Sequence, residues 1–326
     1  MKQFLKDWTL PVAIVLGSAL YLLFACLPPL EPAALALGPV CETILPLSVF
    51  ATLFVTFSKV HFHLMRLCRW HWFIVILQIL LAGLLTVSIL VMEGRGADLS
   101  LKWMLEAVLV CVVAPCATAA PVVTAKLGGD ITQMTTFTLL SSLVCAVLIP
   151  SVFPLIEPST GATFLSAFLV ILGKMAAILV LPLVLGFVVR HWVGRVRRYI
   201  ETHPDLAFYC WAFSLSITAG VTLRNVLQTE SGHTLLLGIA LLTLLTALLQ
   251  YAIGRLAGHH YGVKVCTVQG MFQKNTALAI WVSWLYLSPP SSIGAGCYVL
   301  WQNMINSYEL WQHRREKNLP PSLRGR

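Results

Sequence analysis

Apolar segments of about 20 residues recur along the whole 326-residue chain, and this repetition restricts the possible folds more than any other feature. A helix needs roughly 20 consecutive apolar residues to cross a bilayer, and within lipid its backbone hydrogen bonds must all be made internally. The composition agrees, because 58% of the residues are hydrophobic and only 11% are charged. We therefore expect an all-α polytopic membrane protein.

The apolar segments predict ten transmembrane helices within a single transmembrane domain that spans residues 1–326. The first segment is also compatible with a signal peptide, but the many segments behind it favour a retained helix. Residues 313–326 are expected to form a cytoplasmic tail. The ten segments lie at about 10–27, 36–58, 71–92, 103–127, 131–149, 163–189, 206–225, 234–254, 265–287 and 292–312.

The net charge of +9 indicates membrane orientation rather than nucleic-acid binding. With the N-terminus inside, 17 Lys and Arg residues fall in inside loops and tails and 3 in outside loops. Because positive residues concentrate on the cytoplasmic side, we expect both termini in the cytoplasm and a location in the cell (inner) membrane. The nine Cys residues have no metal-binding spacing, so neither a metal site nor a cofactor is predicted.

The stretch VQGMFQKNTALAIW, residues 268–281, places a polar cluster inside the ninth apolar segment. A lysine at the centre of a membrane costs roughly 2.5–3.5 kcal/mol and therefore needs a partner or a wet cavity. Counted from Lys264, ten helical residues rise about 15 Å, which brings residue 274 near the middle of the bilayer. The cluster predicts an interrupted helix with a binding site, and it comprises Gln269, Gln273, Lys274, Asn275 and Thr276.

The fourth segment carries a similar interruption in APCATAAPVVTAKLGGD, residues 114–130. Pro115 and Pro121 each remove a backbone donor, and Pro121 is suited to the first turn of a new short helix. Asp130 is expected to cap the next helix, with Gln133 at capping-box spacing. A simple proline kink is the alternative. The matching interruption in segment nine favours a true break, with the two breaks crossing at mid-membrane.

Ten helices divide into five plus five around the loop PSTG at 158–161. An odd number of spans per half makes the second half enter from the opposite side, which is the arrangement of an inverted repeat. The expected repeats cover about 10–150 and about 160–312, and the fourth helix of each is the interrupted one.

On these residues the chain resembles the bile acid:sodium symporter (BASS) family. TVQGMFQKNTALAIW is similar to the family's Gly-Met-Gln-Asn-x-x-Leu-Ala signature, and APCATAAPVVTAKLGGD is similar to its broken fourth helix. The resemblance implies a core domain (segments 3, 4, 5, 8, 9 and 10) and a panel domain (segments 1, 2, 6 and 7). It also implies import of organic anions by alternating access, usually with sodium.

The departures from the family pattern fall on the residues that the resemblance assigns to sodium. Lys274 stands where the family has a sodium-binding Gln, and the acidic ligand falls on Gly270, or on Gln269 if one residue is inserted. A Ser-Asn pair becomes Ala120-Pro121. Sodium prefers oxygen ligands, often with a carboxylate, so most of its usual ligands are missing.

Two positions keep the family's residue type: Thr138 matches one hydroxyl ligand, while the other falls on Met134, and Gln78 matches a remaining sodium-site Gln. We hypothesise that the Lys274 ammonium replaces the bound ion, since it supplies three hydrogen-bond donors and a positive charge. Coupling is then absent, or runs on protons. A sodium site is the alternative.

The sequence thus predicts a secondary transporter of a small organic anion and no enzyme, because it contains no HExxH, GxSxG or Asp dyad. A receptor or scaffold without transport is the alternative from another class. Lys174 could attract an anionic substrate, or it could pair with an acid such as Glu42. Thr118, Thr124 and Thr138 could line the site, or they could donate hydrogen bonds to carbonyls of their own helices. The predicted substrate- or ion-binding residues are Lys274, Asn275, Gln273, Thr276, Gln269, Thr118, Pro121, Thr124, Thr138, Gln78 and Lys174.

Overall fold

The computed structural model describes residues 2–27, 29, 31–60, 62–96, 98–158, 161, 163–203, 205–228 and 232–318, without the side chains of 2–11, 31, 33–39, 42, 228, 317 and 318. This part of the chain is helical, as predicted. The α-helices are α1 (Lys2–Cys26), α2 (Glu31–Ser58), α3 (Arg69–Gly94), α4 (Leu99–Val113), α5 (Ala120–Lys126), α6 (Ile131–Ile156), α7 (Phe164–Met175), α8 (Leu181–Trp192), α9 (Gly194–Thr202), α10 (Leu206–Gln228), α11 (His233–Tyr261), α12 (Lys264–Phe272), α13 (Thr276–Tyr286) and α14 (Pro289–Asn318).

Within the described residues, five stretches are long and apolar enough to cross a membrane by length and composition. They are Arg69–Gly94, Ile131–Ile156, Phe164–Trp192, Leu206–Leu227 and His233–Tyr261, and shorter apolar helices accompany them. Long leucine-rich surfaces of these helices stay exposed, as expected where lipid is the solvent. The chain is therefore a multi-pass membrane protein.

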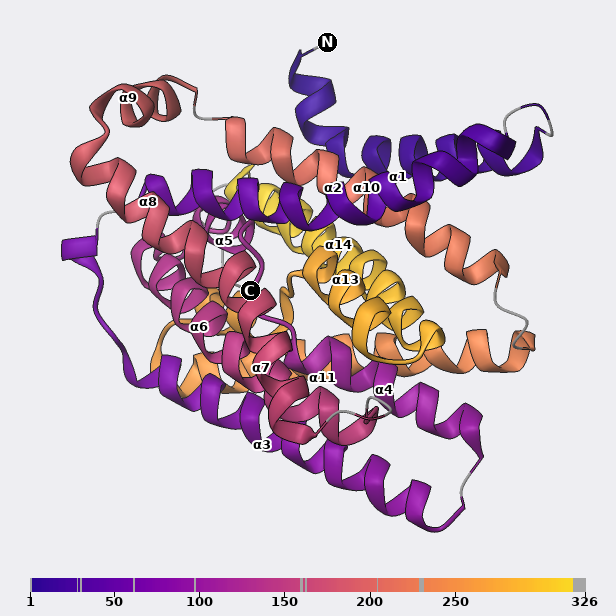
Figure 1. Ribbon diagram of the computed structural model, residues 1–326. Coiled ribbons are helices and arrows are strands. Elements are labelled where there is room, and N and C mark those ends of the chain that lie inside the picture. The colour runs from indigo at the N-terminus through magenta and orange to yellow at the C-terminus, as the bar shows by residue number, and fades with distance from the viewer. Residues whose placement is uncertain are drawn as a thin grey trace.

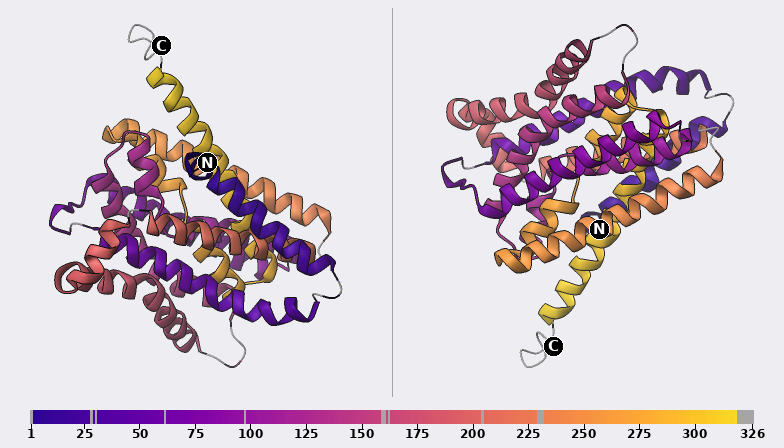
Figure 2. Two further views of the ribbon diagram at one scale, coloured as in Figure 1. Left: turned by 90° about the horizontal axis from the view of Figure 1, so that it is seen from above. Right: turned by 90° about the horizontal axis from the view of Figure 1, so that it is seen from below.

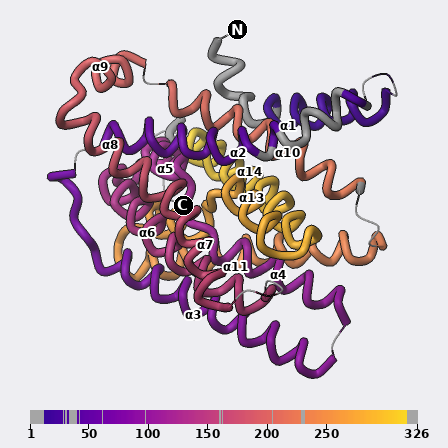
Figure 3. The backbone as a smooth tube through the Cα atoms, in the orientation of Figure 1, coloured from indigo at the N-terminus to yellow at the C-terminus, as the bar shows by residue number. Residues whose placement is uncertain are grey.

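The helices pack in two groups that share one interface. α2 packs on α8 and α10, and α10 also packs on α1, so these helices lie together at the top of Figure 1. The second group contains α3, α4, α6, α11, α12 and α14. Of these, α3, α4 and α11 lie low in that view, and α14 lies in its middle (Figures 1 and 3). α14 contacts both groups, and its C-terminal end projects beyond the other helices in Figure 2.

Prolines shape two helices without ending them. α6 continues through Pro150 and Pro154 to Ile156, so the predicted end at residue 149 was wrong. α7 joins α8 through a π-helical turn, Ala176–Val180, just before Pro182. A wider turn accommodates the missing donor of a proline while the helix runs on, and neighbouring helices shield the freed carbonyls.

One predicted loop is helical. The basic stretch that holds Arg195, Arg197 and Arg198 forms the nine-residue helix α9 rather than an irregular connection. Ile200 is buried against α2 and α8, while the arginines stay exposed. A short helix with one buried side chain and a basic outer face suits a membrane interface. Counting charges along the sequence does not show that this stretch is helical.

Candidate functional site

The first interruption follows from its two prolines. α4 ends at Val113, because Pro115 restricts the preceding Ala114 to an extended conformation with ψ 140°. α5 starts at Ala120 with Pro121 in its first turn, where a missing backbone donor costs nothing. The helix is interrupted here, as the sequence predicted.

The end of α5 is equally well specified. Gly128 has a positive φ of 80°, a conformation that glycine adopts without steric cost. Asp130 then caps α6, as predicted, by accepting hydrogen bonds from the backbone of Thr132 (2.8 Å) and Gln133 (3.0 Å). The Gln133 amide donates to the Asp130 carboxylate and accepts from Trp70 of α3, which fixes the start of α6 against α3.

The second interruption contains no proline. α12 ends at Phe272, Gln273 is extended, and the Asn275 side chain caps α13 by accepting from the backbone of Leu278 at 3.2 Å. Gly270 lies inside α12 rather than at the break. Its missing side chain leaves room for Trp70 and Phe137, whose atoms lie only 3.1 Å from the place of a Cβ.

The two interruptions lie against each other as a short antiparallel pair centred on Cys116 and Lys274. The backbone N–H of Ala117 donates to the carbonyl of Gln273 at 2.9 Å, and that of Asn275 donates to the carbonyl of Pro115 at 2.8 Å. Inside a membrane, backbone groups released from a helix need protein partners. Each interruption supplies partners for the other. We call this pair, residues 114–119 and 273–275, the paired interruptions.

Neighbouring helices satisfy the remaining backbone groups. The Gln302 side chain of α14 accepts from the Lys274 N–H at 2.9 Å and donates to the Lys274 carbonyl at 3.2 Å. Ser141 of α6 accepts from the Cys116 N–H at 2.9 Å, and Tyr298 of α14 donates to the Phe272 carbonyl at 2.7 Å. Side chains of α14 and α6 therefore satisfy backbone groups of both interruptions.

The Lys274 side chain points at the C-terminal end of α4. It is 2% exposed, and its Nζ donates to the carbonyl of Val112 at 3.2 Å. The Gln78 amide of α3 donates to the same carbonyl at 3.0 Å and to those of Val113 and Ala114 at 3.2 and 3.1 Å. The C-terminus of a helix carries partial negative charge, so an ammonium group is favourable there.

These residues do not fit a sodium ion of the kind that the family resemblance implies. The Lys274 ammonium donates to the Val112 carbonyl, and the Gln78 amide donates to this carbonyl and to those of Val113 and Ala114, so the end of α4 is already supplied with donors. Within the described residues, Glu106 is the one buried acid, and it lies six residues before Val112 on α4. Its carboxylate accepts from Ser288 and lies 4.0 Å from Lys102, so it offers the paired interruptions no charge balance.

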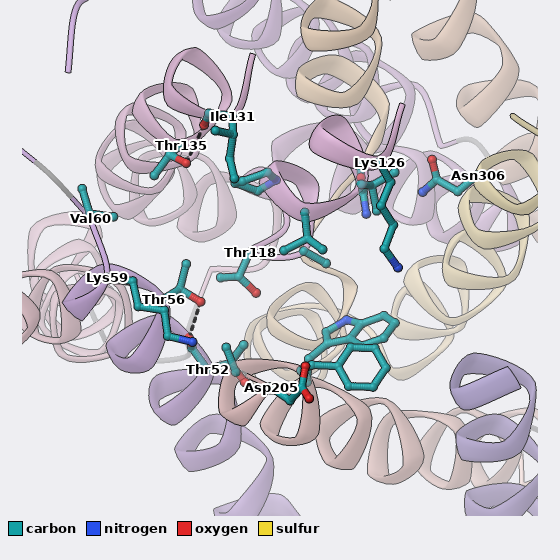
Figure 4. Close-up of a pocket in the computed structure, with 18 of the residues that line it drawn as sticks. Thr52, Thr56, Lys59, Val60, Thr118, Lys126, Ile131, Thr135, Asp205 and Asn306 are labelled. Atoms are coloured by element: carbon teal, nitrogen blue, oxygen red, sulfur yellow. Dashed lines mark hydrogen bonds between the residues drawn. The ribbon is translucent and has the colours of Figure 1, made fainter. Parts of the chain in front are cut away.

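A cavity of about 850 Å³ opens beside the paired interruptions, between α2 and α10 on one side and α5, α6 and α14 on the other. Its volume is within the range of small-molecule sites. Figure 4 shows Thr118 at its centre, with Lys59 and Lys126 on opposite sides. The polar residues that line it are Thr52, Thr56, Lys59, Thr118, Lys126, Thr132, Thr135, Asp205, Gln273, Asn303, Asn306 and Ser307.

Positive charge exceeds negative charge in this cavity, since two lysines and one aspartate line it. Burial lowers the pKa of Lys59, and the carboxylate of Asp205 opposes that shift. Lys126 is exposed to the cavity and has no hydrogen-bond or ion-pair partner among the described residues. Phe208 and Trp211 add an aromatic wall, with ring centroids 5.8 Å apart.

A second cavity of about 30 Å³, room for a water molecule or two, lies next to the main one. It shares Thr118, Trp211, Gln273 and Asn303 with the main cavity. Several of the residues predicted from sequence gather around it, namely Thr118, Gln273, Lys274, Asn275 and Thr276. Pro121 lines the main cavity only.

Four predicted site residues are buried near the paired interruptions without lining either cavity. Gln78 bonds the end of α4, and Gln269 donates to Asn306 at 2.9 Å. Thr138 bonds back to the carbonyl of Met134 at 2.9 Å, the alternative weighed for the threonines. Thr124 is fully buried beside Gly129.

The structure does not bring Lys174 to this site. It lies on the exposed side of α7, with its ammonium 5.3 Å from the ring centre of Tyr286. A cation over an aromatic face is stabilised without a carboxylate. The side chain of Glu42, the acid considered as its partner, is outside the described residues.

Sequence reasoning missed other parts of the site. Gln302, Ser141 and Tyr298 hold the interrupted backbone, and Lys126, Lys59 and Trp211 line the main cavity. An amide halfway along an apolar segment was the available signal for Gln302. The cavity lysines look like ordinary inside-loop charges until the helices are placed.

Two interrupted helices whose breaks pair with each other beside a polar cavity are an arrangement typical of secondary transporters. The model of the Sodium Bile acid symporter family matches residues 30–229, more than half of the chain, so the chain belongs to this family. Its members are secondary transporters rather than enzymes. The match covers α2 to α10 and ends before α11, so the second interruption lies beyond it. A comparison with curated proteins found no match.

Proposed function

We propose that the protein carries a small organic anion across the cell membrane by alternating access, without strict coupling to sodium. The observation that supports this most is the Lys274 ammonium, buried at the paired interruptions with its Nζ 3.2 Å from the Val112 carbonyl. A fixed cation at the end of α4 does electrostatically what a bound ion would do. The cycle then needs no sodium to assemble the site.

The proposed architecture is the one expected from the sequence: ten transmembrane helices in one domain, as two inverted five-helix repeats of about 10–150 and 160–312. In this arrangement α4–α5 and α12–α13 are the interrupted fourth members. α1, α2, α7–α8 and α10 form the panel, and the remaining long helices form the core. The packing of α1, α2, α8 and α10 supports this division.

The direction in which the main cavity opens follows from the proposed orientation. Lys59 and Lys126, which line it, lie at the ends of α2 and α5, and the charge distribution assigns these helix ends to the cytoplasm. With both termini inside, this is an inward-open state. Rocking of the panel against the core would close this cavity and open its counterpart on the outer side.

The charge of the cavity supports an anion as cargo, since lysines outnumber acids on its lining and threonine, asparagine and serine residues supply neutral hydrogen-bond partners. The related proposal of a sodium- or proton-coupled symporter shares this cavity and differs in the driving ion. A non-transporting receptor would bind the same anions but would not move them.

Uptake by proteoliposomes tests the proposal. Purified protein is reconstituted and offered radiolabelled carboxylates, sulfonates and sterol acids, with protein-free liposomes as the blank. We expect saturable uptake of at least one anion, reduced in Lys274→Ala and Asn275→Ala. Binding of anions without any uptake would instead indicate a receptor.

A further inference from the structure

The short helix α9 has a basic side and an apolar side, and neighbouring helices cover little of either. We infer that α9 binds an anionic phospholipid, with Arg195 and Arg198 on its phosphate and with Val196 and Tyr199 against its acyl chains. None of these residues lines either cavity, so the inferred site is separate from the one proposed for transport.

The position of α9 places it at the depth of lipid headgroups. It begins directly after the stretch Phe164–Trp192, which is long and apolar enough to cross a membrane. In Figure 1 α9 lies at the edge of the molecule, next to the end of α8. Trp192 and Tyr199 are 70% and 56% exposed. Because exposed tryptophan and tyrosine side chains concentrate where hydrocarbon meets headgroups, α9 lies along this boundary.

The apolar side of α9 is only half covered by protein. Ile200 is buried in a cluster with Val55 of α2 and Val189 of α8. Val196 and Tyr199 lie within one turn of Ile200 on the same side of the helix, yet both are exposed. A helix in the membrane interface buries such a strip among acyl chains. The uncovered part of the strip therefore suits the chains of a lipid.

The arginines near α9 differ in their partners. Arg197 lies 3.9 Å from the carboxylate of Glu201, and Arg190 of α8 lies 4.0 Å from the same group. The side chains of Arg195 and Arg198 are exposed and have no ion pair or hydrogen bond among the described residues. Since they are three residues apart, they lie on one side of the helix. Two guanidinium groups with free donors match the oxygens of a phosphate.

A lipid bound to α9 should stabilise the contact between two transmembrane helices. α9 packs on both α2 and α8. The Arg190 guanidinium at the end of α8 donates to the carbonyl of Ser58, the last residue of α2, at 3.3 Å. A ligand that binds only the folded protein raises its stability by an amount set by the ligand concentration and the affinity. Anionic lipid should therefore raise the Tm.

Three probes test the site on the full-length protein in a neutral detergent. Dioctanoyl phosphatidylglycerol is the anionic lipid, dioctanoyl phosphatidylcholine has the same chains without net charge, and glycerol 3-phosphate has the phosphate without chains. Affinity is measured by native mass spectrometry and Tm by thermal unfolding. We expect the tightest binding and the largest rise in Tm with phosphatidylglycerol.

The double variant Arg195→Gln/Arg198→Gln should bind phosphatidylglycerol roughly 10-fold or more weakly, because each basic residue near an anionic surface contributes about fivefold. Arg195→Lys/Arg198→Lys keeps both charges and should keep most of the affinity. Arg66→Gln/Arg69→Gln removes the same charge from exposed positions around the start of α3 and is the matched control. It should bind phosphatidylglycerol like the wild-type protein.

An unchanged affinity in Arg195→Gln/Arg198→Gln would overturn the inference, and so would equal loss in the control variant. Equal binding of phosphatidylcholine would contradict the role of charge. Glycerol 3-phosphate that binds as tightly as phosphatidylglycerol would indicate an anion site that needs no lipid. If the double variant does not fold, Arg195→Gln and Arg198→Gln are tested singly, and an unchanged affinity in both would contradict the site.

Discussion

Lys274 makes hydrogen bonds through both its backbone and its side chain, and the two sets of bonds have different partners. Its ammonium interacts with the end of α4, while Gln302 satisfies its N–H and carbonyl groups. The residue is only 2% exposed, so bulk solvent has little access to these groups. The side chain can therefore keep one position relative to α4 throughout a transport cycle.

Replacing Gln302 with leucine should destabilise the protein. The backbone N–H of Lys274 would lose its acceptor while staying buried, which costs about 1–3 kcal/mol of folding free energy. Thermal unfolding in detergent should show a lower Tm. Gln312→Leu on the same helix is the control, because Gln312 is exposed and its change should stay within about 0.5 kcal/mol. An equal Tm for the two variants would argue against this role of the Gln302 side chain.

The sequence predicted Lys274 at mid-membrane because helical rise and a central charge need no tertiary information. It could not predict the partners of Lys274. Gln302 and Ser141 belong to other helices, and in isolation each looks like a polar residue on an apolar segment. The family resemblance pointed to Gln78 and Thr138, but only the fold distinguishes an amide that bonds α4 from a hydroxyl bonded to its own helix.

At the scale of elements, α4 packs closely against α14. A Cβ placed on Gly294 of α14 would lie 2.5 Å from the Cβ of Ala107 and 2.9 Å from its Cα. Because part of this contact is backbone, the helices cannot relieve the clash by a change of rotamer. α14 also carries Gln302, which bonds the Lys274 backbone. The contact between Gly294 and Ala107 therefore fixes the position of α4 relative to Gln302.

Gly294→Ala should therefore lower stability, by about 1–3 kcal/mol, as overpacking of a filled interior does. Gly173→Ala on α7 is the matched control, because nothing lies within 4 Å of its Cβ position. In a helix interior that change should stabilise by about 0.5–1 kcal/mol. The two alanine variants should move the Tm in opposite directions, and shifts of the same sign would contradict this account.

Element boundaries show which signals are local. Pro115, Gly128 and Asp130 act on their own neighbours, so the first break and the cap of α6 were predictable. The end of α6 was not predictable in this way, because the helix continues past Pro150 and Pro154, as burial inside a membrane protein allows. The break at Gln273 has no helix-breaking residue and was recognisable only from its polar side chains.

For the whole molecule, the distribution of Lys and Arg predicts that both termini and the main cavity face the cytoplasm. A green fluorescent protein fused after residue 326 should fluoresce, since it folds in the cytoplasm. Alkaline phosphatase fused after Gly96 should be active, because that loop should lie outside. Swapped results would reverse the orientation and make the main cavity outward-open.

The central claim is that a resident ammonium group replaces a bound sodium ion, and replacing sodium in a transport assay tests it most directly. Initial uptake of a transported anion is measured in proteoliposomes with sodium chloride outside, and again with choline chloride at the same concentration. The account predicts equal rates for the wild-type protein and a large loss in Lys274→Gln under both conditions. Strict dependence of wild-type uptake on sodium would contradict it.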